Sequence, residues 1–169
     1  LDSNGYPHIS YYDWTNGNLK YAYKDASGWH FETVDSKGCV GLYTSLALDS
    51  AGNPHISYYN ATGGDLKYAH RERGWTVDYW VTETVDSQGD VGYFTSIALD
   101  SNGYPHISYY DDTNGNLKYA YYDGSTWHIE TVDSDGDVGW FTSIALDSNG
   151  YPHISYYDDT NGNLKYAYY

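Results

Sequence analysis

Several residue types are scarce in this sequence, and each scarcity removes a class of protein. The 169 residues contain no methionine and a single cysteine, so no disulfide can form within the chain. Lysine and arginine number 8 against 23 aspartates and glutamates, which gives a net charge of −15. This potential repels phosphate backbones and anionic lipids, so we expect no nucleic-acid partner. No apolar run approaches the roughly 20 residues that a spanning helix needs, so we expect no membrane insertion.

Sustained helical periodicity is also missing, whereas residues of strands and turns abound. The chain has 23 tyrosines and 18 glycines, and 19 of its 23 acids are aspartate. Tyrosine suits half-buried strands, and aspartate and glycine suit tight turns, so the composition favours many short strands. Low lysine content with abundant Tyr, Asn, Ser, Asp and Gly is typical of secreted proteins. We therefore expect the protein to be extracellular or at the cell surface.

One segment recurs through the chain and sets its organisation. Leu99–Tyr122 returns letter for letter as Leu146–Tyr169, and looser copies lie at 1–24 and 48–71. One histidine marks each copy, at intervals of 47, 51 and 47 residues: His8, His55, His106 and His153. A period in this range predicts propeller blades or another β-array. We predict an all-β, β-propeller-type array of four-stranded antiparallel blades, about 3.5 repeats in a single region, 1–169.

Each repeat reads as four strands joined by turns. In the third unit the predicted strands are 94–100, 104–110, 117–122 and 127–132, and the predicted unit bounds are 1–41, 42–92, 93–139 and 140–169. The pair Asn114-Gly115 predicts a type I′ hairpin turn. Segment 71–84 of the second unit is four residues longer than its counterparts, which predicts an extended hairpin between the third and fourth strands. Bulky residues on both faces of the middle strands predict sheets buried on both sides.

One motif of the repeats resembles those of secreted bacterial and archaeal propellers. It reads [LI]-A-L-D-S-x-G-x-P-H-I-S-Y-Y-D and is followed by L-K-Y-A and a Trp-led strand. Its layout is similar to that of fucose-specific lectin propellers and, more distantly, of sialidase-like propellers. The sialidase Asp-box, S-x-D-x-G-x-[ST]-W, is matched poorly: Asp123–Trp127 is one residue short, and Tyr121 stands where the leading Ser belongs. The resemblance implies a propeller fold and lectin-like carbohydrate recognition.

Acidic and aromatic residues gather in loops that a four-stranded blade places on one rim. Aromatic faces stack on sugars, and carboxylates accept hydrogen bonds from sugar hydroxyls. The alternative is that these residues only make turns and pack between blades. The candidate ligand-binding residues are Asp13, Trp14, Asp111, Asp112, Trp140, Asp158 and Asp159.

Metal and cofactor signals are weak. Asp133, Asp135 and Asp137 have the one-three-five spacing of calcium loops, but an EF-hand would need Gly and Glu where Val138 and Ile144 stand. Turn chemistry is the favoured interpretation and calcium the alternative, and we predict no other cofactor. Cys39 aligns with aspartates in later repeats, so we interpret it as a stray substitution, with an interchain bridge or a reactive thiol as alternatives.

The repeated histidines and lysines have structural interpretations. A histidine present in every unit is expected to hydrogen-bond within its blade, to a hydroxyl or carboxylate, rather than to bind metal. The lysines are expected to be solvated or paired with carboxylates: Lys20, Lys67, Lys118 and Lys165. Asn60 begins an N-x-[ST] sequon and is a candidate for glycosylation. No nucleophile motif or phosphate-binding loop is present.

These patterns predict a non-enzymatic extracellular binding module with lectin-like recognition of a glycan. The alternative is a structural, self-assembling scaffold that binds a protein surface, and a sialidase-like glycosidase is the least favoured. The sequence begins at the tail of a first strand and stops at the end of a third. Strand edges left open in this way pair with other chains, so we expect an oligomer, or one stretch of a longer array.

Overall fold

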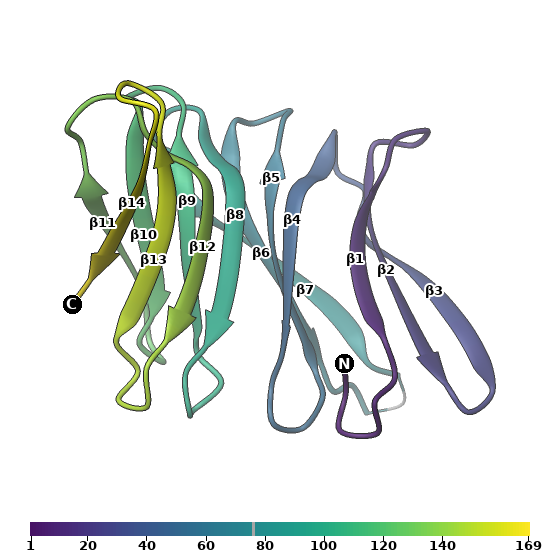
Figure 1. The fold of residues 1–169 in the computed structure, drawn as a ribbon. Helices are drawn as coiled ribbons and strands as arrows, with labels where there is room; N and C mark the ends of the chain where they lie inside the picture. The colour runs from purple at the N-terminus through teal and green to yellow at the C-terminus, as the bar shows by residue number, and fades with distance from the viewer. Residues whose placement is uncertain (76) are drawn as a thin grey trace.

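The computed structural model of the protein describes residues 1–75 and 77–169. In this part of the chain all regular secondary structure is β-strand, which confirms the predicted class. No helix among these residues is long and apolar enough to cross a membrane. The strands form four antiparallel sheets that stand side by side as the chain advances (Figure 1). The predicted blade array is confirmed, and the sheets do not close on themselves.

Each sheet is one blade, numbered here in chain order. The first contains β1 (His8–Asp13), β2 (Asn18–Asp25) and β3 (Gly28–Asp35). The second contains β4 (Val40–Leu48), β5 (Pro54–Asn60), β6 (Asp65–Glu72) and β7 (Tyr79–Asp86). The third contains β8 (Val91–Leu99), β9 (Pro105–Asp111), β10 (Asn116–Tyr122) and β11 (Trp127–Asp133). The fourth contains β12 (Val138–Leu146), β13 (Pro152–Asp158) and β14 (Asn163–Tyr168).

The chain passes between blades slightly earlier than the predicted unit bounds. The connections are 36–39, 87–90 and 134–137, so the bounds at 41/42, 92/93 and 139/140 fall inside β4, β8 and β12. The sequence signal was misleading because each of these strands contains a glycine near its start. Gly92, with φ +105°, lies within β8 at a close approach to Leu66 rather than in a connecting turn.

The predicted long hairpin in 71–84 is confirmed. Residues 73–78 connect β6 to β7, whereas 26–27 connect β2 to β3 in the first blade. Position 76 of this hairpin lies outside the described residues. Trp75 is fully exposed in it, whereas Trp80 on β7 packs against the first blade.

The predicted type I′ turn at Asn114-Gly115 is wrong. Such a turn needs positive φ at both central residues, but of the two only Gly115 has it, at +69°. The loop spans 112–115, and the Gly115 N–H donates to the Asp111 carbonyl at 2.9 Å. The Asp111 carboxylate accepts hydrogen bonds from the Asn114 backbone N–H (3.1 Å) and side-chain amide (2.9 Å). These bonds hold the longer loop in place of the two-residue turn.

The hydrophobic core lies between blades. Leu66 and Tyr68 of the second blade pack against Ile107, Tyr109 and Ala120 of the third, and equivalent clusters join the other neighbouring blades. Every residue of β9 is buried, which confirms the prediction that both faces of the middle strands are covered. Each fully buried Leu or Ile contributes roughly 1.5–3 kcal/mol. Packing of one blade on the next therefore holds the array together and fixes the spacing of the loops.

Candidate functional site

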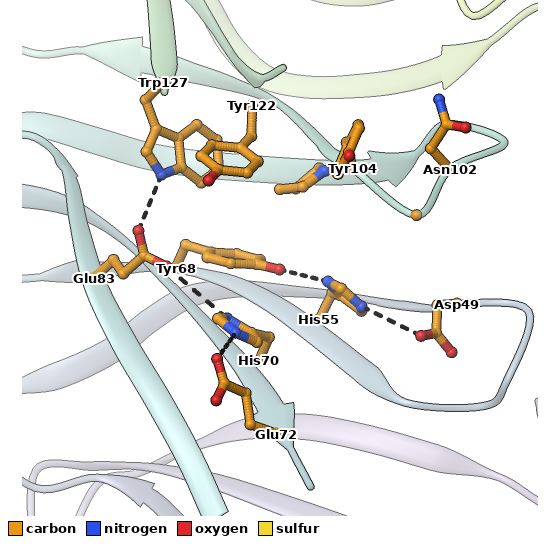
Figure 2. Close-up of a pocket in the computed structure, with 12 residues that line it drawn as sticks. Asp49, His55, Tyr68, His70, Glu72, Glu83, Asn102, Tyr104, Tyr122 and Trp127 are labelled. Atoms are coloured by element: carbon orange, nitrogen blue, oxygen red, sulfur yellow. Dashed lines mark hydrogen bonds and ion pairs between the residues drawn. The ribbon is translucent and has the colours of Figure 1, made fainter. Parts of the chain in front are cut away.

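A cavity of about 400 Å³ opens between the second and third blades (Figure 2). It lies at the end of the blades where β4 turns into β5 and β8 turns into β9. Its lining residues are Asp49, His55, Tyr68, His70, Glu72, Glu83, Asn102, Gly103, Tyr104, Pro105, Tyr122 and Trp127. One wall comes from the second blade and the other from the third.

Three aromatic rings from β5 and β6 form the wall of the second blade. The rings of His55 and His70 stack with centroids 6.2 Å apart, and those of Tyr68 and His70 stack at 5.3 Å. The Tyr68 hydroxyl lies 2.5 Å from Nδ1 of His55. The same His–Tyr bond occurs in the first, third and fourth blades. The prediction that the repeated histidines hydrogen-bond within their blades is thus confirmed.

His55 is neutral at physiological pH. Burial disfavours its charged form and outweighs the attraction of Asp49, which lowers its pKa to about 4. Its Nε2 lies 3.9 Å from Oδ2 of Asp49. Burial raises the pKa of Asp49, but hydrogen bonds from Asn53 and Ala51 outweigh burial and lower the pKa overall. The cavity therefore holds a neutral imidazole beside an ionised carboxylate.

Two further carboxylates flank His70. Oε2 of Glu83 accepts a hydrogen bond from Nε1 of Trp127 at 3.2 Å, and its Oε1 lies 4.0 Å from Nδ1 of His70. That Nδ1 is buried and has no hydrogen-bond partner among the described residues. Nε2 of His70 lies 3.3 Å from Oε1 of Glu72. A hydrogen bond from Tyr79, with one from His70, lowers the pKa of Glu72. The second blade thus presents acceptor oxygens and an unsatisfied ring nitrogen.

The opposite wall, from the third blade, is mostly aromatic. The rings of Tyr122 and Trp127 lie 5.6 Å apart, and Tyr104 meets Tyr122 edge to face at 5.9 Å. Trp127 also meets Tyr68 edge to face at 5.4 Å, which joins the two walls at the base of the cavity. Asn102 and Gly103 close the side formed by the β8–β9 loop (Figure 2). The site combines flat apolar surfaces with polar groups at their edges.

The interface between the first and second blades is filled at the equivalent place. Arg71, which occupies the repeat position of Tyr122, pairs with Glu32. Its guanidinium lies over the rings of Tyr23 and Trp80 at 5.8 and 5.5 Å. Trp80 also donates from Nε1 to Glu32 at 2.8 Å. Arg71 thus fills the space between the first and second blades and binds the Glu32 carboxylate. The equivalent space and carboxylate oxygens remain open between the second and third blades.

The interface between the third and fourth blades holds a smaller version of the cavity. Its volume is about 250 Å³, and it includes His106, Tyr121, Glu130 and Tyr151 at positions equivalent to the larger site. Tyr121 replaces His70 there, so the histidine pair is specific to the cavity between the second and third blades.

The residues predicted from sequence to bind a ligand lie at the opposite end of the blades from this cavity (Figure 1). Three of them, Asp13, Asp111 and Asp158, end a second strand and accept hydrogen bonds from the asparagine three residues later. Trp14 is 84% exposed, and its ring meets that of Tyr12 edge to face. Asp112 and Asp159 are exposed neighbours of these turns.

Trp140 belongs to an aromatic cluster at that same end. Its ring stacks on Phe94 at 5.5 Å, and its Nε1 donates to Asp137 at 2.9 Å. The Tyr110 hydroxyl donates to the same carboxylate oxygen at 2.8 Å. Desolvation, together with repulsion from Asp90 and Asp137, raises the pKa of Asp112. Asp13 and Trp14 lie in a different blade from Trp140.

The aspartates of the 133–137 loop face different partners. Asp133 accepts hydrogen bonds from Lys165 and from Tyr156, whereas Asp137 holds Trp140 and Tyr110. Residues 1–75 and 77–169 contain no group of three or more Asp, Glu, His or Cys side chains placed to hold a metal ion.

The sequon and the cysteine both take part in loop contacts. The Asn60 side-chain amide donates to Asp65 at 2.9 Å. The Thr62 hydroxyl accepts from the Cys39 backbone N–H at 2.7 Å. The Cys39 thiol is free and lies 3.0 Å from the Tyr12 hydroxyl. Asn60 is half-buried, so its amide has a structural role in the turn.

Sequence reasoning did not identify the residues of the interblade cavity. Glu83 lies in the fourth strand of the second unit and Trp127 begins that of the third, and neither is among the residues predicted to bind a ligand. The available signal was the departure of one repeat from the others: His70 and Arg71 stand where the third unit has Tyr121 and Tyr122.

No family model matches the sequence, and no curated protein matches it. Solved structures do match. A protein of unknown function from Dyadobacter fermentans has a TM-score of 0.68 and 18% identity, over 98% of this chain and 50% of that protein. The SapL1 lectin, solved in complex with α-methyl fucoside, has a TM-score of 0.63 and 15% identity, over 99% of this chain and 62% of the lectin.

The NanB sialidase from Streptococcus pneumoniae has a TM-score of 0.55 and 16% identity, over 98% of this chain and 28% of the enzyme. At these identities the likeness establishes the fold alone. The chain has a β-propeller-type fold. The expected resemblance to fucose-lectin propellers, and more distantly to sialidase-like propellers, is confirmed at this level. The chain spans 62% or less of each of these three structures.

Proposed function

We propose that this chain is a non-enzymatic carbohydrate-binding module, and that a neutral sugar binds in the cavity between the second and third blades. One observation carries the proposal: aromatic rings of the third blade, such as Tyr104, face His70 of the second blade across a cavity of about 400 Å³. Glu83 and Trp127, joined by a hydrogen bond, line the same cavity. A sugar ring has an apolar face that stacks on aromatic rings and hydroxyls at its edge that donate to carboxylates. The cavity offers both kinds of contact.

The polar groups of the cavity suit a hydroxyl-rich ligand. Among the described residues, Glu83 accepts one hydrogen bond, at 3.2 Å from Trp127 on Oε2, which leaves acceptor capacity on both oxygens. Its side chain is 40% exposed, so a sugar hydroxyl in the cavity can donate to these oxygens.

The fold relationship to the SapL1 lectin, whose structure holds α-methyl fucoside, supports a sugar ligand. We assign binding rather than hydrolysis because hydrogen bonds from Tyr79 and His70 lower the pKa of Glu72, whereas the general acid of a glycosidase needs a raised pKa. We place the module outside the cell, as its composition suggests, and assign it no cofactor. Chromogenic glycosides of several sugars should therefore release no product.

The test is a glycan array followed by calorimetry, with methyl α-fucoside among the probes. We expect the wild-type chain to bind at least one neutral glycan. Trp127→Ala and Glu83→Gln should each weaken that binding by about tenfold or more, the loss of a well-buried contact. Circular dichroism and the melting temperature of each variant show whether it is folded.

Trp14→Ala is the matched control, because Trp14 is an exposed tryptophan at the opposite end of the blades. It should bind the glycan as the wild type does. Loss of binding in Trp14→Ala with retention in Trp127→Ala would move the site to the rim predicted from sequence. An array without a hit among neutral sugars would overturn the proposed function.

A further inference from the structure

The outward face of the first blade exposes an apolar surface. Ile9 and Trp29 are each 45% exposed and Phe31 is 66% exposed. Together with Tyr11 and Ala22 they line a shallow apolar groove of about 280 Å³. This face points away from the second blade, which packs on the other side of the sheet.

The repeat positions of Ile9 and Tyr11 are buried in every other blade. Ile9 corresponds to Ile56, Ile107 and Ile154, which are 0%, 0% and 1% exposed. Tyr11 corresponds to Tyr58, Tyr109 and Tyr156, all buried. In the second, third and fourth blades these residues pack against the preceding blade. The sequence of the first blade is thus built for a neighbour on its outward face.

The outward face of the fourth blade is exposed in the complementary way. Leu164 is 82% and Tyr166 is 56% exposed. The equivalent residues of the earlier blades are 0–4% exposed because they pack against the following blade: Leu19, Leu66 and Leu117, with Tyr21, Tyr68 and Tyr119. Segment 146–169 is identical in sequence to segment 99–122, whose outward side chains already fit the fourth blade.

We infer that these two faces dock on each other, so that the fourth blade of one copy packs head to tail on the first blade of a second copy. Isolated apolar faces of this kind mark interaction sites. The occupant follows from the chain itself, because its three interior interfaces join the same two kinds of face. A head-to-tail contact is heterologous, so it builds a closed ring, of which a twofold-symmetric dimer is the smallest, or an open assembly.

The contact between copies joins the second- and third-strand positions that meet at an interior interface, such as those of Leu66 and Ile107. The polar part differs: interior lysines pair with the aspartate that ends a fourth strand, whereas Lys20 donates to Thr33 within its own blade. Because the two copies are separate molecules, we expect the fraction of associated protein to rise with protein concentration. This packing of faces is distinct from pairing of open strand edges.

Light scattering coupled to size exclusion tests the proposal on the 169-residue chain. The wild type should shift from 19.1 kDa to larger species as concentration rises. Ile9→Asp removes one face and Leu164→Asp the other, so each variant alone should remain a monomer. Mixed together, each supplies the face that the other lacks, and they should form a one-to-one complex of twice the chain mass.

Trp75→Ser is the control, because Trp75 is a fully exposed aromatic residue on the β6–β7 hairpin, away from both faces. It should assemble as the wild type does. A wild type that stays monomeric at millimolar concentration overturns the proposal. So does a mixture of the two variants that stays monomeric, and so does assembly that survives in each variant alone, which would indicate edge pairing. Circular dichroism confirms that each variant is folded, and Tyr166→Ser replaces Leu164→Asp if that variant is not.

Discussion

Lys118 on β10 places its ammonium nitrogen 2.5 Å from Oδ2 of Asp86, the residue that ends β7 of the preceding blade. The Tyr109 hydroxyl donates to the same oxygen at 2.7 Å. The arrangement recurs as Lys67 with Asp35, and as Lys165 with Asp133. The predicted carboxylate pairing of the repeated lysines is confirmed at these three positions. Each contact between blades therefore contains a specific polar link beside its apolar core.

Asp86→Asn should destabilise the protein strongly. The change leaves a buried ammonium without its counter-charge, and breaking a buried pair in this way costs about 3–5 kcal/mol. Asp133→Asn is the matched variant: the side chains of Lys165 and Asp133 are 30% and 14% exposed, against 11% and 1% for Lys118 and Asp86. Solvent therefore compensates part of the interaction lost in Asp133→Asn, and its unfolding free energy should fall less than that of Asp86→Asn. Urea unfolding of both variants measures the difference, and equal costs would contradict the assigned role of burial.

Acid should weaken the same links. Burial raises the pKa of Asp86, but hydrogen bonds from Lys118 and Tyr109 outweigh burial and lower the pKa overall. The folded protein therefore prefers the ionised form more than the unfolded chain does, whose Asp pKa is about 3.9. The stabilisation is complete above that pH and is lost as the pH falls through the lower folded pKa. Below about pH 4, the unfolding free energy of the wild type should therefore fall more steeply than that of Asp86→Asn.

His55 should titrate near pH 4 in the folded protein, because burial lowers its pKa to about 4. An unfolded histidine titrates near 6.5. Since only the unfolded chain takes up this proton between the two values, the His55 contribution to stability is complete above pH 6.5 and falls as the pH drops towards 4. NMR of the ring protons measures the titration, with His55→Gln to assign the signal. A midpoint near 6.5 would contradict the assigned burial.

Gly92 should tolerate no side chain. Its φ of +105° is unfavourable for other residues, and an added Cβ would lie 2.8 Å from the Leu66 Cα of the neighbouring blade. Gly52 is the control: its φ is +84°, and no atom lies within 4 Å of an added Cβ. Gly52→Ala should cost about 1–2 kcal/mol from backbone conformation alone. Gly92→Ala should cost about 1–3 kcal/mol more, from overpacking. Thermal unfolding of the two variants tests the ordering.

The repeats made the architecture predictable, because equivalent residues such as His55 and His106 recur at a blade-like period and bury the same faces. The cavity was harder to predict, since it arises where repeats differ. The repeat position that holds Arg71 in the second blade holds Tyr122 in the third, and this difference opens the second interface. The effect of the difference depends on which face of the strand meets the next blade. Both ends of the blades carry polar loops, so the composition of the loops could not show which end contains the cavity. The rim chosen from sequence contains turn-making aspartates such as Asp111, whose carboxylate is already occupied.

Calcium removal should leave the protein unchanged. The carboxylates of Asp133 and Asp137 already accept hydrogen bonds from Lys165 and Trp140, respectively. Chelation should shift neither the melting temperature nor the affinity for a bound glycan. A chelator-dependent fall in melting temperature that added calcium reverses, and that Asp135→Asn abolishes, would instead establish the 133–137 loop as a calcium site.

The cavity between the second and third blades should discriminate against acidic sugars. Three of its lining residues are carboxylates, Asp49, Glu72 and Glu83, and none is lysine or arginine. The whole chain carries a net charge of −15, so a sugar carboxylate would approach against both the local and the overall potential. Methyl glucoside and methyl glucuronide form a pair that differs only at C6, where a carboxylate replaces the hydroxymethyl group, and we expect the glucuronide to bind more weakly. Added salt screens the repulsion between exposed charges, so the gap should narrow as ionic strength rises, and Glu83→Gln should narrow it further. Equal or tighter binding of the glucuronide at low salt would show that the sugar does not bind beside these carboxylates.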